Sequence, residues 1–167
     1  KKILDIGTGS GCIIISILKE RKKCKGVGID ISKNAIKLAK YNAKIQHIKN
    51  RINFFHSDID NFLTDKYDLI ISNPPYIKQH EINGLDKDIK NYEPRVALNG
   101  GIDGYSKIRL TIKRSSALIK KNGKLFLEIG SNQVMETLKI LKLNGFFVNK
   151  VVKDLANKNR CVISTKI

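Results

Sequence analysis

The sequence predicts an α/β protein built on a doubly wound, mostly parallel β-sheet. Two observations support this fold class. Short apolar runs alternate with helical patterns along most of the chain, and a glycine-rich turn joins the first run to the first helix. The last two apolar runs are joined by a short polar segment, which is typical of a hairpin. We expect the chain, residues 1–167, to form one domain.

The expected strands lie near residues 2–5, 25–30, 52–56, 67–72 and 124–129, followed by apolar runs at 146–152 and 161–167. Helical patterns cover 12–18, about 32–46 and about 105–120. The second helix has Ile36, Ala39, Tyr41 and Ala43 on its apolar side and lysines on the remaining face. Asn122-Gly123 is a stop signal for the third helix.

The turn after the first strand reads Gly7-Thr8-Gly9-Ser10-Gly11, with Asp5 at the end of the strand. Glycines at alternate positions let a ligand approach the backbone closely, and the Asp5 carboxylate can accept a hydrogen bond from a ligand ammonium group. The G-x-G-x-G spacing differs from the G-x-G-x-x-G of dinucleotide sites and resembles motif I of the S-adenosylmethionine (SAM) methyltransferases. A tight turn without a ligand is the alternative interpretation.

Two further carboxylates follow expected strands. Asp30 ends the second strand roughly 20 residues after the glycine turn, where an acidic residue typically binds ribose hydroxyls. Its alternative role is to cap the next helix, although Ser32 already stands at the capping position. Asp58 follows the third strand, where it or its backbone neighbours would accept from an adenine amino group while Ile59 packs on the ring.

The fourth strand runs into Asn73-Pro74-Pro75-Tyr76. Consecutive prolines restrict the backbone and remove its donors, so the Asn73 side-chain oxygen and the Pro74 carbonyl can both accept from one planar NH2 group. The Tyr76 ring can then lie against the group that bears this nitrogen. The motif therefore suits a carboxamide or an exocyclic base amine. The alternative interpretation is a rigid strand-to-loop turn with a structural role only.

The chain as a whole resembles the PrmC/HemK family of release factor glutamine methyltransferases. The resemblance rests on these motifs and on four later features: residues 91–98, Gly100-Gly101-Ile102-Asp103-Gly104, Leu127-Glu128-Ile129-Gly130, and the pair Asp154 and Arg160. It implies that Gly7 through Gly11, Asp30, Ile59 and Asn73 contact SAM or lie beside it, and that Asn73 through Tyr76 hold the substrate glutamine. It also implies an antiparallel last strand.

The long irregular segment 78–104 follows this loop and is expected to cover the glutamine pocket, with Glu93 and Pro94 shaping its wall. Members of the family carry an amino-terminal substrate-docking domain, whereas this sequence opens on its first strand. We therefore interpret it as the catalytic domain without that docking domain.

Composition argues against a membrane protein and a metal site, and it bears on whether nucleic acid is a partner. No apolar segment approaches the roughly 18 residues of a membrane span, and no signal peptide opens the chain, so a cytoplasmic location and no membrane partner are expected. The three cysteines and three histidines form no zinc pattern, so no metal is expected. The net charge of +17 comes mostly from lysines spread along the chain, which a biased composition explains slightly better than a nucleic-acid partner does.

The leading interpretation is a SAM-dependent enzyme that methylates the side-chain amide nitrogen (N5) of the glutamine in the Gly-Gly-Gln motif of peptide chain release factors. An adenine-N6 DNA or RNA methyltransferase is the alternative, because an exocyclic amine fits the same acceptors once the base is flipped out. The E-P-x-x-A-L stretch within residues 91–98 favours the first. A SAM-binding module without activity is a third class, disfavoured by the intact Asn73 to Tyr76 loop.

Overall fold

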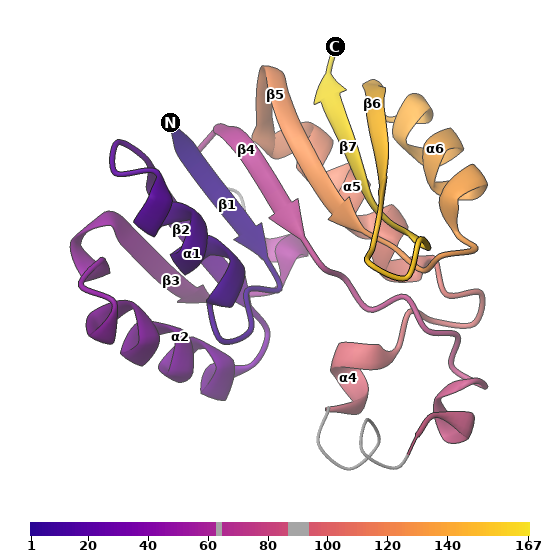
Figure 1. Cartoon of the computed structure of the whole chain (residues 1–167), viewed down its shortest axis with the longest axis horizontal. Coiled ribbons are helices and arrows are strands. Elements are labelled where there is room, and N and C mark those ends of the chain that lie inside the picture. Colours follow the sequence, from indigo (N-terminus) through magenta and orange to yellow (C-terminus); the bar gives the residue numbers. More distant parts are fainter. Residues whose placement is uncertain (63–64, 87–93) are drawn as a thin grey trace.

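The computed structural model describes residues 1–62, 65–86 and 94–167, and its framework is one seven-stranded sheet (Figure 1). The strands lie in the order β3-β2-β1-β4-β5-β7-β6. Their bounds are β1 (Lys2–Ile6), β2 (Lys25–Asp30), β3 (Ile52–His56), β4 (Tyr67–Ser72), β5 (Ile119–Glu128), β6 (Phe146–Lys153) and β7 (Asn159–Lys166).

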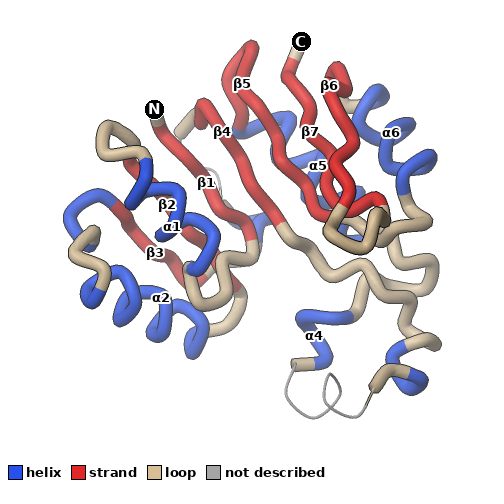
Figure 2. Tube along the Cα trace, in the orientation of Figure 1, coloured by secondary structure: helices blue, strands red, loops and turns tan. Residues whose placement is uncertain are grey.

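Helices cover both faces of the sheet. Figure 2 shows α1 (Cys12–Glu20) and α2 (Lys33–Ile45) over the half made by β1, β2 and β3, while α5 (Ser106–Leu118) lies behind the sheet and α6 (Val134–Leu143) lies beside β6. The short α4 (Arg95–Leu98) lies beyond the carboxyl ends of the parallel strands. Three 3₁₀ turns complete the described elements: Lys49–Arg51, Ile59–Asn61 and Ile82–Gly84.

The doubly wound sheet that the sequence predicts is confirmed. β1 pairs in parallel with β2 on one side and with β4 on the other, so the strand order reverses at β1. β7 runs antiparallel to both β5 and β6, as expected for the last strand. In such sheets, ligands bind where the loops after the two central strands separate. The loops after β1 and β4 are the glycine turn and the segment beginning at Asn73.

Two local expectations are wrong. Helix α5 ends at Leu118 and β5 begins at Ile119, so Asn122-Gly123 is not the helix stop. Asn122 does adopt a left-handed backbone, with φ of 63°, but it does so inside the irregular start of the strand. Tyr41 is 61% exposed, because it lies five positions after Ile36 and a helical turn of 3.6 residues places it away from the buried side.

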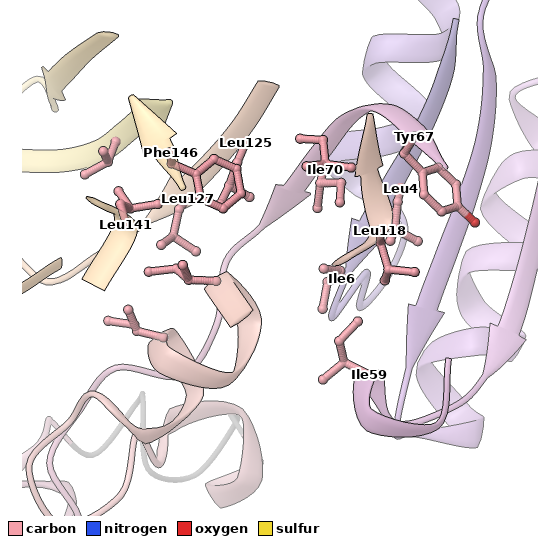
Figure 3. Packing of buried hydrophobic residues seen from close by; sticks show 14 of the residues in the cluster. Leu4, Ile6, Ile59, Tyr67, Ile70, Leu118, Leu125, Leu127, Leu141 and Phe146 are labelled. Carbon is pink, nitrogen blue, oxygen red and sulfur yellow. The ribbon is translucent and has the colours of Figure 1, made fainter. Parts of the chain in front are cut away.

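Apolar packing fills the space on each face of the sheet. One cluster joins the sheet to α5 and α6, and Figure 3 shows Leu4, Ile70 and Leu125 among its members. A second cluster joins the sheet to α1 and α2 through residues such as Ile14, Leu18 and Phe54. Among the described residues, no helix is long and apolar enough to span a membrane.

We expect Gly28→Ala to destabilise the fold, because a Cβ on this strand would lie 2.6 Å from the Phe54 ring and 2.9 Å from the Thr8 hydroxyl oxygen. Overpacking a buried site of this kind costs about 1–3 kcal/mol of unfolding free energy. Urea denaturation of the purified variant measures it. Gly84→Ala is the matched control, since a Cβ there meets no atom of the described residues within 4 Å, and an equal loss in both variants would contradict the packing argument.

Candidate functional site

The glycine turn after β1 is fastened to β2 and α2 by hydrogen bonds. The backbone N–H groups of Gly7 and Thr8 both donate to the Ile29 carbonyl at 2.9 Å. The Asn42 side chain of α2 donates to the Ser10 carbonyl at 2.9 Å. Gly7, Gly9 and Gly11 have φ values of 71°, 55° and 78°, a backbone region that favours glycine. The alternating glycines therefore allow a left-handed turn that neighbouring elements hold in place.

A cavity of about 360 Å³ opens beside this turn. It extends from the ends of β1 and β2 to the loop after β4, with α4 and α5 on its far side. From the first half of the chain it is lined by Ile6, Gly7, Gly9, Ile29, Asp30, Ile31, Ser32, Ala35, Ser57, Asp58, Ile59 and Ser72. From the second half it is lined by Asn73, Pro74, Pro75, Pro94, Val96, Ala97, Lys107, Leu110 and Thr111.

Asp30 connects the glycine turn to the start of α2. One carboxylate oxygen accepts from the Gly9 N–H at 2.8 Å, and the other accepts from the Ser32 N–H at 2.8 Å. Ser32 is the helix cap, because its hydroxyl oxygen accepts from the Ala35 N–H at 3.2 Å. Each Asp30 oxygen keeps a further lone pair for a ligand hydroxyl, so Asp30 shapes the cavity while also lining it.

Asp5 lies behind the glycine turn and is not among the residues that line the cavity. Its side chain is 2% exposed and accepts from the Thr8 hydroxyl at 2.8 Å. Burial raises the pKa of Asp5 to about 6, with a smaller upward contribution from the charge of Asp30, while the Thr8 hydrogen bond opposes the rise. Contact between Asp5 and a ligand ammonium group, as expected from the sequence, stays a prediction.

Two hydrogen-bond acceptors of the loop after β4 are available to a ligand. Asn73 and Pro74 both line the cavity. Among the described residues, no group donates to the Asn73 side-chain oxygen or to the Pro74 carbonyl. Unpaired acceptors beside a cavity are costly unless water or a ligand supplies the donors. Binding of an NH2 group by these two acceptors stays a prediction.

The hydroxyl of Tyr76 points away from this cavity toward the ends of β5 and β7. It donates to Glu128 at 3.4 Å and accepts from Arg160 at 3.3 Å, and Arg160 also pairs with Asp154 at 3.2 Å. Partial burial raises the pKa of Glu128, and partial burial together with the Glu128 charge raises the pKa of the Tyr76 hydroxyl. Stacking of Tyr76 on a substrate stays a prediction.

The segment 98–104 supports the backbone of the same loop. The Ile77 N–H donates to the Leu98 carbonyl at 3.1 Å, and the Gly100 N–H donates back to the Ile77 carbonyl at 2.8 Å. A Cβ on Gly100 would lie 2.8 Å from the Tyr76 Cα. The glycines of this segment therefore permit close contact between two backbones, which is a structural reason for the Gly100-Gly101-Ile102-Asp103-Gly104 stretch.

The structure gathers most of the expected site residues around one cavity. Asp58 and Ile59 line it from the turn after β3, and Pro94 lines it next to α4. Thr8, Ser10, Gly11 and Tyr76 support it without lining it. Glu93 lies outside the described residues, and among those described no group of three or more His, Cys, Asp or Glu residues could hold a metal ion.

Helix α5 contributes three lining residues that sequence reasoning missed: Lys107, Leu110 and Thr111. Their spacing of three and four positions places them on one face of the helix, and this spacing is the signal that could have revealed them. Thr111 is 4% exposed, whereas Lys107 is exposed. The helix thus lines the cavity with one apolar side chain, one buried hydroxyl and one exposed cation.

Comparison with known proteins gives a family and a fold. Residues 1–89 match the family model described as methyltransferase small domain. The chain is 42% identical over 99% of its length to a release factor glutamine methyltransferase of Thermodesulfovibrio yellowstonii, covering 59% of that protein. It is 39% identical over 99% of its length to a bifunctional methyltransferase of Rickettsia felis, covering 32% of it. The chain thus spans well under two thirds of these curated relatives.

Among solved structures, the chain superposes on a ribosomal protein L11 methylase of Lactobacillus delbrueckii with a TM-score of 0.73 and 19% identity. The match covers 99% of this chain and 70% of that one. At this identity the likeness concerns the fold alone. It confirms the Rossmann-like methyltransferase fold that the sequence predicts.

We expect the contribution of Asp5 to the stability of the fold to fall as the pH rises from about 4 to about 6, because Asp5 has a raised pKa of about 6 in the folded chain. The folded state then binds more protons than the unfolded state in this range, and the cost of ionising Asp5 above it is about 3 kcal/mol. Asp5→Asn removes this titration. The stability of the variant relative to the wild type should therefore be higher at about pH 6 than at about pH 4.

Urea denaturation at each end of this pH range tests the expectation. Asp86→Asn, which alters an exposed carboxylate, is the control. A stability difference between wild type and Asp5→Asn that does not change with pH would show that Asp5 titrates normally.

Proposed function

The chain belongs to the methyltransferase small domain family, and from that premise we propose that it transfers a methyl group from SAM to the glutamine side-chain nitrogen of the Gly-Gly-Gln motif in peptide chain release factors. The relatives that are named release factor glutamine methyltransferases support the substrate. On the structural side, the proposal is supported by two acceptors beside a cavity at the glycine turn, the Asn73 side-chain oxygen and the Pro74 carbonyl, to which no group of the described residues donates. The cytoplasm is the compartment we propose for it.

The residues around the turn suit SAM. A Cβ placed on Gly7 or Gly9 would meet no atom of the described part of the chain within 4 Å, and both glycines line the cavity, so the backbone there is open to a ligand. Asp30 would hold the ribose hydroxyls, and Asp58 and Ile59 would hold the adenine. SAM supplies an electrophilic methyl group on a sulfonium centre.

The chain's own contribution to the reaction is to position the nucleophile. A carboxamide nitrogen is a poor nucleophile because its lone pair is delocalised into the carbonyl. Acceptance of both amide hydrogens, by the Asn73 side chain and the Pro74 carbonyl, would fix the nitrogen and direct its lone pair toward the methyl group. The nitrogen–methyl bond would form as the sulfur–methyl bond breaks, and the resulting amide cation would lose one proton to water. Proximity and orientation of this kind can lower the activation barrier of a reaction by several kcal/mol. The upper range, about 7–11 kcal/mol, is reached in well-oriented intramolecular reactions.

The proposed substrate is tested by incubating the protein with tritiated SAM and either a release factor or duplex DNA or RNA. We expect label only on the release factor, and mass spectrometry should place it on the Gly-Gly-Gln glutamine. Replacement of that glutamine by glutamate should abolish the reaction, because a carboxylate offers no hydrogens to the two acceptors. Label on adenine N6, or label that persists after the glutamine is replaced, would favour the nucleic-acid alternative.

We expect Asp30→Ala to weaken SAM binding by about 1.5–3 kcal/mol, the usual value of a hydrogen bond to a charged group. Part of the loss would come from the glycine turn, because the Gly9 N–H also loses its acceptor. Titration calorimetry measures the affinity. Asp30→Asn keeps one oxygen acceptor and should lose less, and an unchanged affinity in folded Asp30→Ala would remove the ribose assignment.

We expect Asn73→Ala to lower the methyl-transfer rate at saturating SAM far more than it weakens SAM binding, because its side-chain oxygen is assigned to the substrate nitrogen. Single-turnover kinetics separate the two effects. Asn50→Ala, an exposed asparagine of the turn before β3, is the control. Retention of more than about a tenth of the rate, a barrier change under about 1.4 kcal/mol, would mean that Asn73 is not part of the chemical centre.

A further inference from the structure

Gln133, in the turn before α6, contacts the loop after β4 through its side-chain amide. Its side chain is 6% exposed. The side-chain Nε2 donates to the Tyr76 carbonyl at 3.1 Å and to the Gly104 carbonyl at 3.1 Å, while Oε1 accepts from the Gly130 N–H at 2.9 Å. One buried amide therefore connects the loop after β4, the segment 98–104 and the end of β5.

The surroundings are matched to an amide at this position. Both Nε2 hydrogens have acceptors and Oε1 has a donor, so turning the amide over would set Oε1 against two carbonyls. The neighbouring glycines leave the space it needs, since a Cβ on Gly130 would lie 2.9 Å from Oε1 and a Cβ on Gly104 would lie 3.0 Å from Nε2. Neither an acid nor an apolar side chain can replace all three contacts.

The Tyr76 carbonyl belongs to the last residue of the Asn73 to Tyr76 motif. Only Pro75 lies between this carbonyl and the Pro74 acceptor, and the Pro75 ring fixes one of the torsions that join the two carbonyls. The next residue, Ile77, is paired with the segment 98–104 that Gln133 also holds. The direction of the Pro74 carbonyl thus depends on contacts made at Tyr76.

We propose that Gln133 is a positioning residue, which orients the acceptors of Asn73 and Pro74 by fixing the Tyr76 carbonyl and the supporting segment. The inference rests on the proposed methyl transfer to a glutamine amide. Gln133 itself does not line the cavity. Its removal should therefore lower the rate of methyl transfer while SAM affinity is preserved.

Two variants test this. Gln133→Met keeps a similar length and loses all three hydrogen bonds, whereas Gln133→Glu keeps the acceptor for the Gly130 N–H and loses both donors. We expect kcat for release factor methylation to fall about 10- to 100-fold in each, with the Kd for SAM changed by less than about twofold. Hydrogen exchange of the Ile77 and Gly100 amides, which report the loop pairing directly, should become at least about tenfold faster.

Ile140→Ala is the control, because Ile140 is buried in α6, the helix that follows Gln133, at 7% exposure, and its loss leaves a cavity without removing a hydrogen bond to the loop after β4. It should leave kcat and the two exchange rates near those of the wild type. The proposal is overturned if the Gln133 variants lower kcat no more than Ile140→Ala does, or if exchange at Ile77 and Gly100 is unchanged. If the wild type methylates no release factor, the proposed function fails, and the exchange comparison still decides the role of Gln133.

Discussion

The rest of the site depends on the two hydrogen bonds that the Asp30 carboxylate accepts. Its two oxygens hold the Gly9 N–H and the Ser32 N–H, so one side chain fixes both the left-handed glycine turn and the first turn of α2. Without this connection, a turn built from glycines would have many accessible conformations, because glycine loses the most conformational entropy on ordering. A preorganised turn spares ligand binding that cost.

The second half of the site is organised by the same means, which is the anchoring of a backbone by buried polar side chains. Prolines restrict the loop after β4 from within, and Gln133 and the segment 98–104 hold it from outside. The Tyr76 hydroxyl adds a third anchor through Glu128 and Arg160. Asn73 and Pro74 line the cavity, and among the described residues no group donates to the Asn73 side-chain oxygen or to the Pro74 carbonyl, so both acceptors are available to a ligand.

The sequence predicted those parts of the molecule that local patterns encode. The glycine turn, Asp30 and the loop after β4 follow apolar strands directly, and parallel strands bring their carboxyl ends together. What it could not predict depends on contacts between distant residues. Gln133 bonds to a carbonyl 57 positions away, and Asn122 resembles a helix stop although pairing with β4 draws residues from Ile119 onward into a strand. The place of Lys107, Leu110 and Thr111 in the cavity wall could be recognised only once the packing of α5 against the sheet was known.

Charge within the cavity differs from charge on the whole protein. The chain carries +17 overall, yet among the described residues the ionisable groups that line the cavity are Asp30, Asp58 and Lys107, two carboxylates against one cation. A third carboxylate, Asp5, lies directly behind the turn with its ionisation held back by burial. A sulfonium ligand is cationic, and a site with local negative charge favours it, whereas an anionic ligand would meet carboxylates at the ends of two strands. The local arrangement of these groups, more than the overall charge, therefore determines which small molecule suits the cavity.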